Sequence, residues 1–140
     1  MNAKHMATFA LAAAILLGLA ACAGGGGTTG DPLKGTSWRL TTLGGASLIP
    51  GTEITATFED GEVRGSACNT YGGTYRVSGD RLTMSEVFMT EMACVEPQGI
   101  MEQELAFFSL LTSAQSFKLT DGGLRILGAG GEELTFAPAQ

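Results

Sequence analysis

Three cysteines and one histidine are the residues of this 140-residue chain that could most directly perform chemistry. The histidine, His5, precedes a long apolar run at the N-terminus, so a chain that lost this run would contain no imidazole. Without histidine there is no Ser-His-Asp triad, no Cys-His pair and no histidine zinc site. Two further cysteines supply too few ligands for a metal. We therefore expect no metal, no cofactor and no histidine-dependent catalysis.

The first cysteine, Cys22, ends the N-terminal apolar run. Lys4 supplies a positive start, Met6 to Ala21 is almost unbroken in its apolar character, and small residues stand just before the cysteine. This order is typical of an export signal, and we assign residues 1–21 to it. The run is shorter than the ~20 residues of a spanning helix, and a single anchoring helix remains the alternative.

Residues 19–22, Leu-Ala-Ala-Cys, resemble the lipobox of bacterial lipoproteins. The resemblance implies that the chain is cut before Cys22 and that this cysteine carries the lipid that anchors the protein to a membrane. Two acyl chains give stable anchoring, whereas one alone binds a membrane only weakly. Residues 22–34, rich in Gly and Thr, would be a flexible tether. Ala23 stands where lipoproteins of the inner membrane usually carry Asp. We expect a cell-envelope protein, anchored in the outer membrane and facing the periplasm.

The other two cysteines, Cys68 and Cys94, form an even pair in a chain that is predicted to enter an oxidising compartment. Such a pair favours a disulfide, with two buried free thiols as the alternative. Both stand at the ends of probable strands. The disulfide would pin these two ends together.

Charged residues give little support to an enzyme. Eight Lys and Arg stand against fourteen Asp and Glu, a formal charge of −6, which argues against nucleic acid and suits a neutral or basic partner, or simple solubility. Glu59, Asp60 and Glu62 could act on glycosides only at the right separation, and they are better explained as solvated turn charges. Lys34 and Lys118, which a Ser-Lys hydrolase would need, lie in no motif. We predict no enzymatic activity.

Short strands with one helix between them must position these residues. Glu53–Glu59 alternates apolar and polar residues strictly, which is typical of a strand with one solvent-exposed face. Asp60-Gly61, which follows it, favours a hairpin turn. Strands are predicted at Trp38–Leu43, Glu53–Glu59, Val63–Cys68, Thr74–Val77, Arg81–Ser85, Ser116–Thr120, Leu124–Leu127 and Glu133–Ala137.

The region Gln98–Ser113 is predicted to be the helix. Met101, Leu105, Phe108 and Leu111 recur at helical spacing and would face the sheet, while Glu102 and Glu104 would favour the helix dipole in the first turns. The fold class is α+β, an antiparallel β meander curled toward a barrel with one amphipathic helix packed on it. We expect one domain, residues 35–138, and a monomer.

Two stretches around the cysteine pair form the predicted corner, GSACNTYGGTY at 65–75 and TEMAC at 90–94. Asn69 can shape such a corner by bonding nearby backbone. With Tyr71 and Met92 it makes a candidate binding surface, because a disulfide would hold a tyrosine and a methionine together. The alternative is that these residues only close the fold.

These two stretches, with a Trp-x-Leu strand before them and a glutamate-bearing helix after them, resemble the META domain of bacterial lipoproteins and of the heat-shock protein HslJ. The resemblance covers Gly35 to Phe136. It implies a β domain of the cell envelope without established enzymatic activity, involved in stress tolerance. The predicted function is a non-enzymatic binding or support module, with an envelope protein as its possible partner. The alternative is a lipid-anchored inhibitor of a basic exported hydrolase such as lysozyme.

Overall fold

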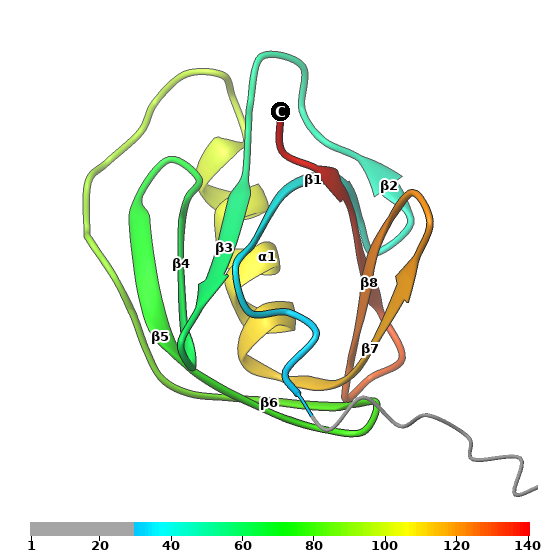
Figure 1. The fold of residues 1–140 in the computed structure, drawn as a ribbon. Coiled ribbons are helices and arrows are strands. Elements are labelled where there is room, and N and C mark those ends of the chain that lie inside the picture. Colours follow the sequence, from blue (N-terminus) through cyan, green and yellow to red (C-terminus); the bar gives the residue numbers. More distant parts are fainter. Residues whose placement is uncertain (1–29) are drawn as a thin grey trace, which may run out of the picture.

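A closed antiparallel barrel of eight strands with a single helix makes up the computed structural model, which describes residues 30–140 (Figure 1). The barrel order is β1-β3-β4-β5-β6-β7-β8-β9, and pairing of β1 with β9 closes it, while the short β2 pairs only with the end of β1. The elements are β1 (Thr36–Leu43), β2 (Ala46–Ser47), β3 (Thr55–Glu59), β4 (Glu62–Ser66), β5 (Thr70–Ser78), β6 (Arg81–Met89), α1 (Ile100–Thr112), β7 (Ala114–Thr120), β8 (Gly123–Gly128) and β9 (Glu133–Pro138).

The predicted meander and its tight turns are confirmed. Each strand from β3 to β9 pairs antiparallel with the strand before it in the barrel. Asp60 and Gly61 join β3 to β4 with φ of 46° and 83°, the positive values that a tight hairpin between twisted strands needs. The predicted fold class, α+β with a sheet curled into a barrel, is therefore correct.

Inward-facing side chains fill the barrel. Phe58 and Tyr75 pack edge to face with ring centroids 5.0 Å apart, an arrangement that aromatic pairs prefer. The fully buried side chains include Leu33, Ile54, Phe58, Val63, Leu82, Phe107, Leu111, Leu124, Ile126, Leu134 and Phe136. The interior of the barrel is therefore a packed core.

The folded part begins earlier than predicted. Leu33 has no exposed surface, and the backbone N–H of Leu33 donates to the Asp31 carboxylate at 2.9 Å. A residue that is buried and hydrogen-bonded belongs to the core, so the boundary predicted at Gly35 lies too late. The predicted signal, Cys22 and the first part of the predicted tether lie outside the described residues.

The strand β6 also runs further than its alternating pattern predicts, to Met89. Its register against β5 shifts opposite Gly72 and Thr74, and Glu86 has a φ of 52°. A β-bulge places one extra residue in a strand, so the inward-outward alternation restarts out of phase beyond it. The strand predicted at Arg81–Ser85 therefore stops where the bulge begins and not where the strand ends.

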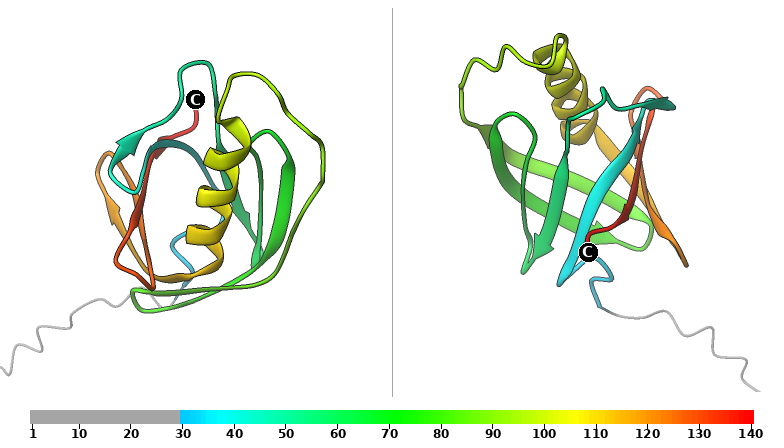
Figure 2. Two further views of the ribbon diagram at one scale, coloured as in Figure 1. Left: turned by 180° about the vertical axis from the view of Figure 1, so that it is seen from behind. Right: turned by 90° about the horizontal axis from the view of Figure 1, so that it is seen from above.

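The helix α1 lies across one opening of the barrel (Figure 2). Its predicted extent is right to within two residues. Of its predicted buried face, Leu111 is buried and Phe108 packs against the core, but Leu105 is not buried. Leu105 is 55% exposed and Met101 and Phe108 are half-buried, whereas Glu104, Phe107, Leu110 and Leu111 are buried. The face toward the barrel is rotated from the predicted one because a glutamate, normally a surface residue, lies on it.

The two ends of the barrel differ in what they hold. At one end, which we call the terminal end, Gly35 N–H donates to the Phe58 carbonyl and Ala139 N–H to the Ser37 carbonyl, so the chain enters and leaves the barrel side by side (Figure 2, right). At the other end lies the corner, made of residues 66–70 and 90–94 beside α1. Within residues 30–140, no helix has the length and hydropathy needed to cross a bilayer.

Candidate functional site

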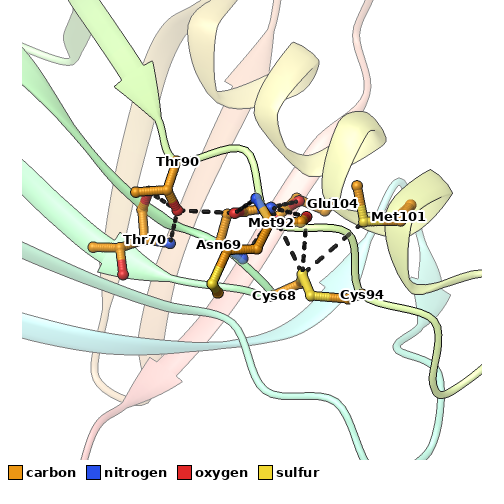
Figure 3. The surroundings of a disulfide bond; sticks show 8 residues. All are labelled: Cys68, Asn69, Thr70, Thr90, Met92, Cys94, Met101 and Glu104. Atoms are coloured by element: carbon orange, nitrogen blue, oxygen red, sulfur yellow. Dashed lines mark hydrogen bonds between the residues drawn. A yellow bond between two sulfur atoms is a disulfide. The ribbon is translucent and has the colours of Figure 1, made fainter.

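The corner is joined covalently by a disulfide between Cys68 and Cys94, as predicted (Figure 3). The two Cα atoms are 6.2 Å apart, within the usual range for a disulfide. Cys68 lies in the link between β4 and β5, and Cys94 lies in the segment that leads from β6 to α1. The bond therefore fixes an irregular segment to the end of two strands.

Asn69 is the centre of a buried polar network in the corner, with only 1% of its surface exposed. Its side-chain oxygen accepts from the Met92 N–H at 2.7 Å and from the Thr90 hydroxyl at 2.8 Å, while its amide donates to the Met92 carbonyl at 3.2 Å. Asn69 thus shapes the corner, as predicted, but it does so by holding a distant segment and not by a bond two residues along its own chain.

Glu104, from α1, completes this network. Its two carboxyl oxygens accept from the backbone N–H of Asn69 at 2.6 Å and from the Asn69 side-chain amide at 2.8 Å, and Glu104 is 3% exposed (Figure 3). Throughout residues 30–140, every buried side-chain nitrogen or oxygen has a hydrogen-bond partner. Sequence reasoning missed this role for Glu104, although the carboxyl lies three positions before buried Phe107 and seven before buried Leu111.

Tyr71 lies in the core and not on a surface. It is 3% exposed, its hydroxyl donates to the Thr55 carbonyl at 2.7 Å, and its ring lies 5.4 Å from that of Phe107 between centroids. Burial raises the pKa of its hydroxyl above the ordinary tyrosine value. The predicted binding surface is therefore wrong for Asn69 and Tyr71, because the sheet and the helix cover both.

Met92 is the one member of that predicted trio that faces solvent, with 56% of its surface exposed. Its backbone N–H and carbonyl are both held by Asn69, so the backbone is fixed while the side chain is free. The structure brings all three residues to the corner, but only the methionine can contact another molecule.

A cavity of about 290 Å³ adjoins the corner between the start of β3, the end of β4 and the first turns of α1. Gln103 stabilises its wall, accepting from the Ile49 N–H at 2.7 Å and donating to the Thr52 hydroxyl at 2.9 Å. The lining residues are Gly51, Thr52, Glu53, Ile54, Ser66, Ala67, Cys68, Ile100, Gln103 and Glu104. Hydroxyls and carboxylates are present, but no histidine or lysine among these described residues lines the cavity to activate a nucleophile.

Metal chemistry finds no support in the described part of the chain. Among residues 30–140, no three or more His, Cys, Asp or Glu gather where they could hold a metal ion. The geometry of the corner is that of a satisfied structural network beneath an exposed surface. The fold as a whole is a small β-barrel with one helix across one opening and a disulfide-linked corner beside it.

The family follows from the sequence. Residues 31–140 match the META domain, and the chain belongs to this family, which is not a known enzyme family. A comparison with curated proteins gives no match.

Two solved structures share the fold. A protein of known NMR structure is 26% identical over 76% of this chain and 91% of its own, with a TM-score of 0.62. A protein from Burkholderia xenovorans, also solved by NMR, is 23% identical over 99% of both chains, with a TM-score of 0.61. At 23% identity, the similarity to the Burkholderia xenovorans protein supports the fold alone.

Proposed function

We propose that this META domain protein is a non-enzymatic lipoprotein of the cell envelope, a binding or support module in envelope stress tolerance. The anchor would be the acylated Cys22, in the outer membrane and facing the periplasm. One observation carries the proposal: the chain enters the barrel at the terminal end, and the disulfide corner lies at the opposite end. A domain tethered through residues before Asp31 would hold its corner away from the membrane, accessible to envelope proteins.

Replacing Cys22 with Ala tests the anchor and the function together. We expect the wild type to incorporate labelled palmitate and to fractionate with outer membranes, and the Cys22→Ala variant to lose both properties. If the function depends on this location, the variant should also fail to restore tolerance of envelope stress in a deletion strain. Equal labelling of the two proteins would contradict the anchor, and full restoration by unanchored protein would contradict its role.

A second candidate, a lipid-anchored inhibitor of a basic exported hydrolase such as lysozyme, is favoured by the charge distribution. Four exposed glutamates, Glu86, Glu91, Glu96 and Glu102, and no Lys or Arg lie between Arg81 and Lys118. This stretch includes most of β6, the corner segment and α1. An acidic face attracts a basic enzyme. The test is lysis of a cell-wall suspension by lysozyme with increasing amounts of this protein, and an unchanged rate at large molar excess removes this candidate.

A further inference from the structure

The helix α1 carries an apolar face that the barrel covers only in part. Met101, Leu105 and Phe108 follow one another at spacings of four and three, so they share one side of the helix. Leu105 is 55% exposed, and the other two are half-buried. Residues of this kind at helical spacing usually face a core. Here the barrel covers Phe107 and Leu111, and Phe108 packs against the core, whereas Leu105 faces solvent.

This face continues across the disulfide onto the segment before the helix. The Cys68 sulfur lies 4.0 Å from the Met101 sulfur and 4.0 Å from the Met92 carbonyl oxygen (Figure 3). Met92 is 56% exposed, and Val95, next to the disulfide partner Cys94, is 80% exposed. We call these four residues the outer patch: Met92, Val95, Met101 and Leu105.

The backbone under the outer patch is held in place. Both backbone groups of Met92 bond to the Asn69 side chain, and the disulfide fixes the segment two residues further on. Contacts made by a preorganised surface lose little conformational entropy on binding. Exposed apolar side chains on a fixed backbone are therefore better suited to binding than the same side chains on a free loop.

Acidic residues adjoin each part of the outer patch. Glu91 precedes Met92, Glu96 follows Val95, and Glu102 follows Met101, and all three are exposed. No basic residue occurs between Arg81 and Lys118 to balance them. Like charges disfavour a second copy of this chain or an anionic lipid surface at this position, whereas a basic partner is attracted.

We propose that the outer patch docks a basic protein through an apolar segment flanked by Lys or Arg. The inference rests on the proposed binding function and specifies its surface and the chemistry of its partner. Apolar contacts would supply the buried centre of the interface, and the glutamates would supply its charged rim. Ligands of this description include amphipathic basic helices as well as the surface of a basic enzyme.

The test uses residues 22–140 with Cys22→Ala in solution, so that neither export nor acylation is needed, and a fluorescent amphipathic peptide of leucine and lysine as the probe. We expect saturable binding that weakens as salt is raised, and none to a peptide in which glutamate replaces the lysine. The double variant Val95→Ser/Leu105→Ser and the charge reversal Glu91→Lys/Glu96→Lys should each weaken binding about tenfold, the typical effect of losing a central or charged contact.

Matched variants elsewhere on the barrel serve as controls. Leu119→Ser removes an apolar side chain that is 36% exposed on β7, and Glu59→Lys/Glu62→Lys reverses two charges at the terminal end. Both should bind the peptide as the wild type does, and all variants should unfold at the wild-type midpoint because the altered residues are exposed. Equal weakening by the control variants, binding to the glutamate peptide, or unchanged binding in both patch variants would overturn the proposal.

The peptide assay and the Cys22→Ala experiment test different proposals, so a negative result in one does not imply a negative result in the other. Peptide binding needs the outer patch but neither export nor acylation, whereas fractionation and palmitate labelling need Cys22 and not the patch. Self-association of the wild type that disappears in Val95→Ser/Leu105→Ser would identify a second copy as the occupant and would also overturn the proposal. If Cys22 is acylated but the peptide does not bind, the proposed location stands and the proposal of a basic partner is wrong.

Discussion

The two ends of the barrel are stabilised in different ways. At the terminal end, Asp31 accepts from the Tyr75 hydroxyl and from the Leu33 N–H, and Lys34 pairs with Asp60. At the corner, a disulfide and a network of buried hydrogen bonds join three segments that are far apart in the sequence. The terminal end therefore depends on single contacts whose acceptors, Asp31 and Asp60, are partly or fully exposed, whereas the corner depends on buried groups that must all be in place together.

This contrast indicates where a substitution should be tolerated. Removing one member of a buried network leaves its partners without hydrogen bonds, and that penalty exceeds the value of the bond itself. Contacts near solvent can be replaced by water. Substitutions in and beneath the corner should consequently lower the free energy of unfolding far more than substitutions at the terminal end.

The largest loss is expected from Gly65→Ala, on β4 below the corner. A Cβ at this position would overlap the Thr55 carbonyl oxygen and lie 2.7 Å from the Tyr71 hydroxyl, so the backbone itself would have to move. We expect a loss of about 4 kcal/mol in the free energy of unfolding, or failure to fold. Gly122→Ala is the control, since a Cβ there meets nothing within 4 Å. Denaturant unfolding of both variants measures the contrast.

Loss of the disulfide should follow. The bond joins residues 26 positions apart, and the loop-entropy relation gives about 3.5 kcal/mol for a closed loop of that size. Cys68→Ser/Cys94→Ser should lower the urea midpoint, and a reducing agent should do the same to the wild type. A reducing agent that shifts the double variant as strongly as the wild type would show that the effect has another source.

Glu104→Ala should cost about 3 kcal/mol, because two donors of buried Asn69 lose their acceptor. Its neighbour in the sequence offers a sharp control. Glu102 is exposed in the first turn of α1, and Glu102→Ala should change stability by no more than about 0.5 kcal/mol. Similar losses in both variants would mean that the helix dipole, and not the corner network, explains the effect.

Alkaline pH should weaken both ends together. Burial raises the pKa of Tyr71, and burial with the hydrogen bond to Asp31 raises the pKa of Tyr75. The folded protein holds these protons more tightly than the unfolded chain, so the contribution is complete below about pH 10 and is lost as pH rises further. Unfolding midpoints measured across this range should fall, and Tyr71→Phe and Tyr75→Phe should each remove part of the fall.

The smallest effect is expected at the terminal end. Asp31→Ala removes the acceptor of the Tyr75 hydroxyl and of the Leu33 N–H. Asp31 is itself partly exposed, so water can take the place of its carboxylate, and we expect a loss of about 1 kcal/mol. Thermal unfolding of this variant beside Glu104→Ala compares the two ends directly. A loss as large as that of Glu104→Ala would contradict the difference between the ends.

Local signals predicted much of the fold from the sequence. The strict alternation of Glu53–Glu59 and the positive-φ turn at Asp60-Gly61 are properties of neighbouring residues, and both occur in the structure. The disulfide could be predicted from an even pair of cysteines and the predicted oxidising compartment alone. The bulge at Glu86 could not be predicted, because it depends on the register against β5 and not on the local pattern.

The candidate site was harder to predict because its contacts are long-range. Glu104 is buried only because Asn69, 35 positions earlier, supplies two donors, and no property of the helix sequence reveals them. The same contact turns α1 so that Leu105 faces out and Phe107 faces in. Assigning Tyr71 to a surface failed for a similar reason, since the Thr55 carbonyl that receives its hydroxyl belongs to another strand.

The pairing of β1 with β9 has a consequence for the order of folding. These are the first long strand and the last strand of the domain, and their register joins Trp38 to Pro138 and Leu40 to Phe136. The barrel cannot close until the last residues of the chain are available, so its closure carries a large loop entropy and should come late. A chain truncated before Glu133 would keep its hairpins and the helix yet leave β1 and β8 as open edges, templates for pairing with other chains.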